Sequence, residues 1–294
     1  MTVSTVLMYH ALSDDGCSAG DADPHYTLTR DRFKEQLQMM RALGLGLCSV
    51  RDAVQGSPHL DEAPYVALTF DDGHASNAAA TEEITRNGGR ADFFVNPSTV
   101  GRANHLSWSE LRQMAGSGMS IQSHGYTHRY LDALSQAEVE SELTDSKKEI
   151  EDRLGQPVSL FAPAGGRMPK QFVELARSAG YTAVCASQPG GWTHGGNRAI
   201  PRFAVLASTT DVQLRRWVTG ARLEMLLQLA RYRMLRTTRH LLGNRTYELI
   251  RTALLGQPRD RAAMIPGEAN GATENRRHSA RPIPVEPPRK DNLK

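Results

Sequence analysis

Hydrophobic and polar positions follow two spacings along the first two-thirds of the chain. Short apolar runs that end in polar residues predict strands. These runs are residues 5–9, 45–50, 66–70, 91–96, 119–123, 160–163, 182–186 and 199–205. The stretches between them carry the spacing of amphipathic helices. The predicted helices are residues 32–43, 77–86, 108–115, 136–154 and 170–179.

Polar residues at the ends of these segments support the predicted helices. Ser107 with Glu110, and Ser135 with Glu138, have the spacing of a capping box, in which each side chain bonds the other residue's backbone N–H. Glycines also stand where three of the helices are expected to end.

Regular alternation of strands and helices over residues 5–205 predicts an α/β fold with a mainly parallel sheet. The number of units favours a closed or nearly closed barrel, and an open doubly wound sheet is the alternative. We assign this part, residues 1–210, to one domain. In parallel barrels, catalytic groups lie where strands end and loops begin.

The alternation stops beyond Asp211. Residues 211–256 are predicted to form a basic amphipathic helical extension, because leucines interleave there with nine arginines. Such helices suit peripheral association with an anionic membrane through residues 212–255, or packing on the barrel with the arginines in water. No recognised motif supports nucleic-acid binding. Residues 257–294, rich in proline and charge, are predicted to be a disordered tail.

Composition narrows the class of protein. The 294 residues carry a formal net charge of +3 and are 39% hydrophobic, as in ordinary soluble proteins. Cys17, Cys48 and Cys185 are too scattered for a disulfide framework, so free thiols are expected. The N-terminus lacks the pattern of a signal peptide, and no apolar stretch approaches ~18 residues. We therefore expect a cytoplasmic enzyme, with membrane contact only through the basic helices.

Two acidic residues follow the strand predicted at residues 66–70. Asp71 and Asp72 precede Gly73, which permits a tight turn. Adjacent carboxylates repel each other unless a cation or separate hydrogen bonds compensate them. Asp-Asp-Gly is also a common turn sequence, so this cluster by itself is more typical of a turn than of a site.

Two histidines follow the strand predicted at residues 119–123. His124 and His128 can converge on one ion if the segment coils, as neutral histidines do around zinc, although each could equally be structural. With one aspartate they make a facial ligand set that leaves positions open for water and substrate. The other aspartate then stays free beside that water, which is what hydrolysis of an unactivated amide requires.

In their order, these motifs resemble the polysaccharide deacetylase family, also called the NodB-homology or carbohydrate esterase 4 family. The resemblance covers residues 3–206. It rests on Leu7-Met-Tyr-His10, Thr69-Phe-Asp-Asp-Gly73, Leu106-Ser-Trp108, Ser123-His-Gly-Tyr-Thr-His128 and Phe161-Ala-Pro-Ala-Gly165. The first and third are most similar to the exopolysaccharide and poly-N-acetylglucosamine deacetylase branch. The resemblance implies a distorted (β/α)7-type barrel and an N-acetylated carbohydrate as the substrate.

The resemblance also implies roles for the two clusters. Asp71 is expected to be the general base. The expected ligands of one divalent metal ion are Asp72, His124 and His128, with zinc as the first choice and cobalt or nickel as alternatives. Thr127 is expected to brace the loop between the histidines.

Two family motifs are altered in this chain. The third usually reads Arg-x-Pro-aromatic-Gly, and both the arginine and the aromatic are missing. The backbone N–H of Ala164 can still donate to the oxyanion, a contribution of about 3 kcal/mol. Arg202 is the expected replacement for the arginine that positions the base, ahead of Arg167. The fifth motif, Leu-x-x-His, supplies a general acid and has no counterpart, so His10 is expected to act instead, ahead of His194.

We therefore predict a metal-dependent hydrolase that removes N-acetyl groups from a glycan or a lipid-linked glycan precursor. Trp192 and Tyr126 are expected to stack on sugar rings, although each could belong to the core. Two other interpretations stay open. One is a catalytically weakened carbohydrate-binding protein, which the altered motifs suggest. The other is a hydrolase of a non-sugar amide, because a fold does not fix a substrate.

Overall fold

A parallel sheet forms the centre of the computed structural model, which describes residues 5–14, 20, 22–56, 64–193, 199–234 and 237. Its strands are β1 (Thr5–Tyr9), β4 (Gly46–Cys48), β5 (Tyr65–Phe70), β6 (Asp92–Val95), β7 (Ser120–Ser123), β8 (Leu160–Phe161), β9 (Ala183–Val184) and β10 (Phe203–Ala204). They follow the order β10-β1-β5-β6-β7-β8-β9, and β4 pairs with the start of β5.

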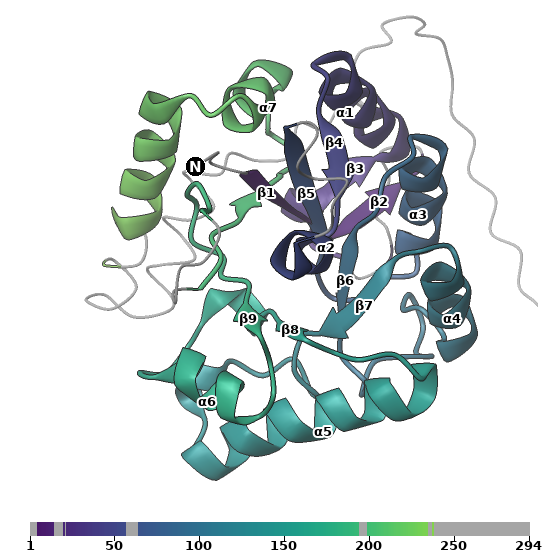
Figure 1. Ribbon diagram of the computed structural model, residues 1–294, viewed down its shortest axis with the longest axis vertical. Coiled ribbons are helices and arrows are strands. Elements are labelled where there is room, and N and C mark those ends of the chain that lie inside the picture. The colour runs from purple at the N-terminus through teal and green to yellow at the C-terminus, as the bar shows by residue number, and fades with distance from the viewer. Residues whose placement is uncertain are drawn as a thin grey trace, which may run out of the picture. The chain divides into compact units, whose positions relative to one another are not determined.

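The two ends of this sheet meet. A parallel bridge joins Cys185, directly after β9, to Ile200, which precedes β10. The N–H of Ala186 donates to the Ile200 carbonyl at 2.8 Å. Figure 1 shows the curled sheet with most helices outside it. The predicted α/β barrel of the distorted (β/α)7 type is confirmed, and the open doubly wound sheet is wrong.

Helices connect the strands, as parallel pairing requires. They are α1 (Arg30–Ala42), α2 (Val50–Gln55), α3 (Asn77–Arg86), α4 (Trp108–Gly116), α5 (Gln136–Leu154) and α6 (Phe172–Ser178). Five of them were predicted, and the capping boxes at Ser107 and Ser135 are formed. Helix α2 was not predicted. It begins inside the run assigned to a strand, because the Ser49 side chain accepts from the N–H of Asp52 and starts a helix there.

A small second sheet precedes α1. It consists of β2 (Ala11–Ser13) and β3 (Thr27–Thr29), which pair in parallel. Strands of this length leave no readable alternation in the sequence, so neither was predicted.

Side chains alternate across the large sheet, and the alternation separates two apolar clusters. Leu68 and Phe93 belong to the larger cluster, between the sheet and the helices. Ala67 and Phe94, one residue away, belong to the smaller cluster inside the barrel. Because the side-chain period of a strand is two, Asp71 shares the inward parity of Ala67.

Small side chains leave room inside the barrel. Ala162, Cys48 and Cys185 belong to the inner cluster. The two cysteines are free thiols, as expected, and Cys17 lies outside the described residues. The space that they leave accommodates Arg202, whose side chain is fully buried.

Beyond β10 the chain continues on the barrel. Helix α7 (Asp211–Val218) buries Leu214 and Trp217, and the Trp217 ring stacks on Phe203 with centroids 5.1 Å apart. A further helical segment covers residues 222–234. The rest of the predicted extension and the predicted disordered tail lie outside the described residues, so the proposed domain boundaries stay predictions.

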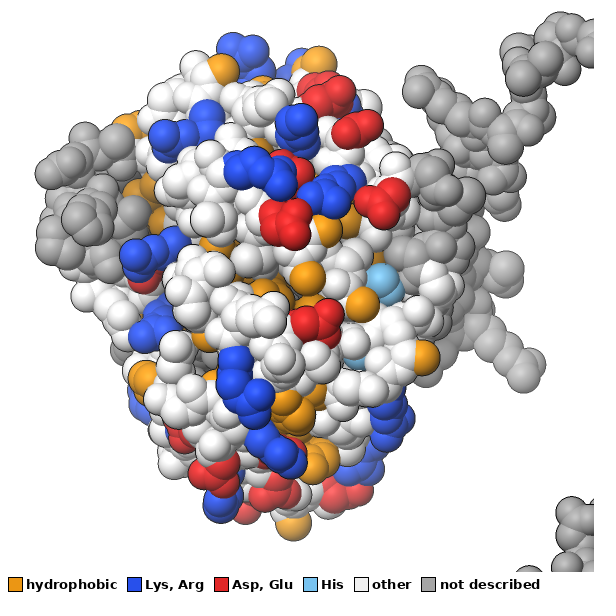
Figure 2. All heavy atoms as spheres, turned by 90° about the vertical axis from the view of Figure 1, so that its right-hand side faces the viewer, with side chains coloured by type: hydrophobic (Ala, Val, Ile, Leu, Met, Phe, Trp, Pro, Cys, Tyr) orange, Lys and Arg blue, Asp and Glu red, His pale blue; other side chains and the backbone are white. Residues whose placement is uncertain are grey.

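The described surface carries both signs of charge. Figure 2 shows Lys and Arg side chains intermixed with Asp and Glu on one face. Arg86 and Glu83 of α3 form one of the ion pairs of the fold. Within the described part of the chain, no helix has the length and apolar character needed to cross a membrane.

Candidate metal and catalytic site

A cavity of about 1760 Å³ opens at the carboxyl ends of the strands. Residues from β1, β5, β6 and β7 line it directly after each strand ends: His10, Asp71, Asp72, Asn96 and His124. This edge is where a parallel barrel collects its catalytic groups. The two polar clusters of the sequence therefore share one cavity.

Asp72, His124 and His128 meet in this cavity. Oδ1 of Asp72 lies 3.3 Å from Nε2 of His124 and 3.1 Å from Nε2 of His128. One ligand atom from each residue lies within 4.8 Å of the other two. Nδ1 of His124 lies 2.8 Å from the Ala162 carbonyl oxygen. Because a carbonyl only accepts, Nδ1 carries the proton and Nε2 presents its lone pair toward Asp72.

The chemistry of these three donors fits a divalent metal ion. Burial would raise the pKa of Asp72, but hydrogen bonds with His124 and His128 hold that pKa well below its usual range. The pKa of His128 is raised, chiefly by its hydrogen bond to Asp72. A carboxylate flanked by two imidazole nitrogens is a typical donor set for zinc and similar ions, and it leaves positions open for water and substrate.

Buried polar side chains hold the loop between the histidines from two sides. Glu142 of α5 accepts from the N–H groups of Tyr126 and Thr127, at 2.5 and 3.0 Å, and from the Thr127 hydroxyl. Nδ2 of Asn96 donates to the Gly125 carbonyl at 3.0 Å. Gly125 has a φ of +83°, and a Cβ there would lie 2.9 Å from Oε2 of Glu142. The loop therefore needs a glycine at this position.

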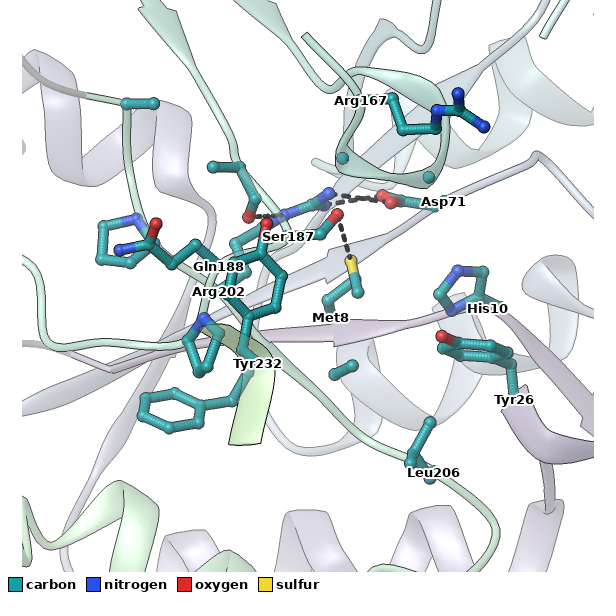
Figure 3. Close-up of a pocket in the computed structure, with 18 of the residues that line it drawn as sticks. Met8, His10, Tyr26, Asp71, Arg167, Ser187, Gln188, Arg202, Leu206 and Tyr232 are labelled. Carbon is teal, nitrogen blue, oxygen red and sulfur yellow. Dashed lines mark hydrogen bonds and ion pairs between the residues drawn. The ribbon is translucent and has the colours of Figure 1, made fainter. Parts of the chain in front are cut away.

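Asp71 forms a buried ion pair with Arg202. The two Nη atoms of Arg202 donate to the two carboxylate oxygens at 2.7 and 2.8 Å (Figure 3). Burial alone would raise the pKa of Asp71, but the charge and hydrogen bonds of Arg202 bring it below its ordinary value. The carboxylate is thus anionic at neutral pH, as a general base must be.

Arg202 reaches Asp71 from inside the barrel. It directly precedes β10, and its guanidinium carbon lies 5.3 Å from the centre of the Phe94 ring. Nη1 also donates to the Thr69 hydroxyl, and Nε donates to the Ala186 carbonyl, both at 3.2 Å. These bonds satisfy the buried charge and fix the plane of the guanidinium group.

Arg167 was the predicted alternative to Arg202, and His194 the predicted alternative to His10. Arg167 has its Nε 2.9 Å from Oδ1 of Asp132, and its guanidinium carbon lies 4.2 Å from the centre of the Tyr130 ring. It is therefore engaged away from the carboxylate of Asp71. His194, the alternative general acid, lies outside the described residues.

His10 lies on the cavity wall beside the aspartates. Its ring centre is 4.4 Å from that of Tyr26 (Figure 3), and Asn77 donates to its carbonyl at 2.6 Å. Burial lowers the pKa of His10, and the charges of Asp72 and Asp71 oppose that shift. Nδ1 of His10 is buried and makes no hydrogen bond within the described part of the chain. Such unsatisfied groups are rare in folded proteins and are frequent at functional sites.

The residues predicted to bind substrate lie in different places. Ala164 is buried at the start of the short 3-10 turn η4 (Ala164–Gly166), and the two glycines after it line the cavity. Trp192 lines the cavity and is largely buried. Tyr126 does not line it, because its ring lies at α5, where the hydroxyl donates to Glu149 at 2.9 Å. The local sequence did not show which of these residues line the cavity.

Two residues of the site were missed in the sequence, although each left a signal. Asn96 ends an apolar run, as Asp71 does, and therefore lies at the same edge of the sheet. Glu142 occupies a position on the buried stripe of α5, between Val139 and Leu143. A charged residue at a core position indicates a specific buried partner.

Comparisons with known proteins find similarity to deacetylases. Residues 60–184 match the family model described as polysaccharide deacetylase. YxkH of Bacillus subtilis, provisionally named a polysaccharide deacetylase, is 30% identical over 189 residues, which are 63% of this chain and 64% of that protein. The peptidoglycan-N-acetylglucosamine deacetylase of Bacillus cereus is 28% identical over 155 residues, covering 51% of this chain and 70% of that protein.

Solved structures share the fold. IcaB from Ammonifex degensii superposes with a TM-score of 0.63 at 22% identity, over 74% of this chain and 97% of that chain. Over residues 60–184 the chain is therefore similar to polysaccharide deacetylases, as its motifs predicted, and its fold is similar to that of IcaB. The match to YxkH spans 64% of that relative's length.

Proposed function

We propose that this protein is a metal-dependent hydrolase that removes N-acetyl groups from a glycan or a glycan precursor. The observation that carries the proposal is the Asp71–Arg202 pair beside the cluster of Asp72, His124 and His128. An anionic base next to a site for one divalent ion is what hydrolysis of an unactivated amide needs. The relatives named as deacetylases support this reaction class.

The proposed roles follow from the positions of the side chains. Asp72, His124 and His128 would hold the ion, with zinc as the first choice and cobalt or nickel as alternatives. Such an ion, when bound, supplies a Lewis acid for the acetamide carbonyl. Asp71 accepts the proton of the attacking water. Arg202 keeps Asp71 anionic and fixes its orientation, because each carboxylate oxygen is bonded to one guanidinium nitrogen.

Two further groups complete the proposed reaction. The backbone N–H of Ala164 donates to the oxygen that becomes negative when water adds to the carbonyl, which is worth about 3 kcal/mol. His10 is the proposed general acid, which passes the proton that Asp71 took from water to the departing amine as the carbon–nitrogen bond breaks. Its buried Nδ1, which has no hydrogen-bond partner among the described residues, supports this role. Trp192 is proposed to contact the sugar from the cavity wall. Tyr126 is given no part in substrate binding.

The proposed substrate is an N-acetylated sugar in an exopolysaccharide or a lipid-linked precursor. N-acetylglucosamine stands in the name of the Bacillus cereus relative. The likeness to the fold of IcaB and the two motifs near His10 and Trp108 support the exopolysaccharide branch. A catalytically weakened sugar-binding protein is the main alternative. The Asp71–Arg202 pair argues against it, because sugar binding does not require a buried, desolvated ion pair.

Acetate release tests the proposal directly. A panel of N-acetylglucosamine oligomers would be incubated with metal-reconstituted wild type, with Asp71→Asn, and with Asp145→Asn as a control at an exposed carboxylate of α5. We expect acetate from wild type and control but not from Asp71→Asn, with equal metal content in all three. Absence of acetate from wild type with one bound metal would contradict sugar deacetylation and direct the search to other amides.

We further propose that the helical segment 222–234 associates with an anionic membrane. On its exposed side lie Leu223, Leu226 and Leu227, which are 72%, 63% and 57% exposed, together with Arg222. Apolar side chains beside arginines are typical of interfacial helices, in which leucines enter the headgroup region and arginines pair with anionic lipid.

Other residues of this segment line the cavity, which supports a lipid-linked substrate. Leu229 and Tyr232 line the cavity, and Figure 3 shows Tyr232 among the residues of its wall. Flotation with phosphatidylglycerol vesicles at low salt should recover wild type but not Leu226→Asp. Wild type that ignores these vesicles would exclude the membrane proposal. The cytoplasmic location expected from the sequence stays a prediction.

A further inference from the structure

One exposed aromatic side chain stands apart from the rest of the described surface. Six large apolar side chains are exposed there, and five of them lie in α7 and in residues 222–234. The sixth is Tyr130, with 47% of its surface exposed. It lines the same cavity as Asp72, His124 and His128. An exposed aromatic ring that lines a candidate active site is placed to meet a ligand.

The backbone on both sides of Tyr130 is fixed. His128, two residues earlier, is one of the three residues that could hold the metal ion. The next residue, Leu131, is buried in the main apolar cluster and begins the 3-10 turn η3 (Leu131–Ala133). The fold therefore sets the position of the ring relative to Asp72, His124 and His128.

The ring itself is also held in place. The guanidinium carbon of Arg167 lies 4.2 Å from the ring centre, and Nε of Arg167 is bound to both oxygens of Asp132 at 2.9 and 3.0 Å. In addition, a Cβ on Gly165 would lie 2.9 Å from Cε1 of Tyr130. The small residue at position 165 thus lets the ring lie directly against the η4 turn. Little conformational entropy is left for a ligand to remove.

A fixed aromatic ring suits the apolar face of a sugar. The face of the ring carries partial negative charge, which attracts the C–H groups of a pyranose. Arg167 covers one face, 47% of the residue's surface remains exposed, and the residue lines the cavity. Polar groups for a sugar's hydroxyls are close by in the cavity wall, among them Asp132 and Lys170.

We propose that Tyr130 is a sugar-stacking subsite, which binds a pyranose ring of the substrate next to the catalytic cluster. The inference rests on the proposed function for the identity of the ligand as a carbohydrate. It adds a binding residue that belongs neither to the sequence motifs nor to the Asp71–Arg202 pair.

Affinity and turnover measured together test this subsite. Binding of N-acetylglucosamine oligomers would be measured by calorimetry in the Asp71→Asn background, and kcat and KM would be measured with Asp71 intact. Tyr130→Ala should weaken binding and raise KM by about two- to tenfold, with kcat little changed. Tyr130→Phe should keep wild-type affinity, because the ring remains. Val212→Ala, at an exposed apolar residue of α7, is the matched control.

Each outcome separates the two proposals. If wild type releases acetate and Tyr130→Ala keeps the KM and affinity of the control, the subsite is wrong and the proposed reaction stands. If Asp71→Asn binds no oligomer and wild type deacetylates none, both proposals fail. Thermal unfolding of every variant would exclude misfolding as the cause, and an intact Tyr130→Phe with weakened binding would also count against ring stacking.

Discussion

The buried pair between Asp71 and Arg202 predicts a large and pH-dependent loss of stability. Arg202→Met keeps an unbranched side chain of smaller volume but removes the charge. Asp71 then remains in the barrel interior without its partner, since both groups are almost fully buried. Removal of one member of a buried ion pair costs about 3–5 kcal/mol of unfolding free energy. We expect this variant to lose that much at neutral pH.

The sign of the pH dependence follows from the pKa of Asp71. In wild type this pKa is lowered, so the pair stabilises the fold above the ordinary carboxyl pKa of about 3.9 and loses effect as the pH falls through the lowered value. In Arg202→Met, burial loses its main opposing influence, the charge and hydrogen bonds of Arg202, and we expect the pKa of Asp71 to rise above its unfolded value. The stability of the variant then falls as pH rises, because the charged form is disfavoured in the folded state. The difference from wild type therefore grows from acid toward neutral pH.

Urea unfolding followed by tryptophan fluorescence measures this difference. Wild type, Arg202→Met and the double variant Asp71→Asn/Arg202→Met would be compared at about pH 5 and about pH 8, all with a chelator. The double variant should be more stable than Arg202→Met at the higher pH, because it holds no unpaired charge. Arg153→Met removes an exposed arginine of α5 and should change stability by less than about 0.5 kcal/mol. If Arg202→Met lost no more stability relative to wild type at about pH 8 than at about pH 5, this result would refute the reasoning.

Three other substitutions test separate parts of the structure. Glu142→Gln should weaken metal affinity by about 10- to 100-fold, because the loop between the histidines loses its charged hydrogen-bond acceptor. Competition with a chelator measures this affinity. Unchanged affinity would contradict the role of Glu142 in holding the loop. The pKa of Asp92 is raised to about 7 by burial, so wild-type stability should fall as pH rises from about 4 to about 7. Asp92→Asn should flatten that part of the pH profile, and an identical slope in both proteins would exclude Asp92 as its source. Ser107→Ala removes the capping box of α4 and should cost about 1 kcal/mol, with metal affinity unaltered; a loss below the error of urea unfolding would show that the cap is dispensable.

The sequence alone determined the barrel and the identity of the central clusters. Strand and helix spacings are local properties, because they depend on which neighbours share a face. Asp71, Asp72 and His124 could be recognised for the same reason, since each directly follows an apolar run that ends at the catalytic edge. Helix α2 was not predicted, because it begins in an apolar run that also suits a strand. The side chain of Ser49 acts as the N-cap that starts the helix there.

Tertiary structure decided which distant residues meet around these clusters. Arg202 pairs with Asp71 across 131 positions of sequence, and the closure of the sheet through Cys185 and Ile200 brings its strand into place. Tyr126, between the two histidines, lies against α5, whereas Tyr130, two residues after His128, lines the cavity. The alternation along a strand determines which side chains point into the barrel. The packing of the whole barrel determines which residues those side chains contact, because contacts between remote segments leave no period in the sequence.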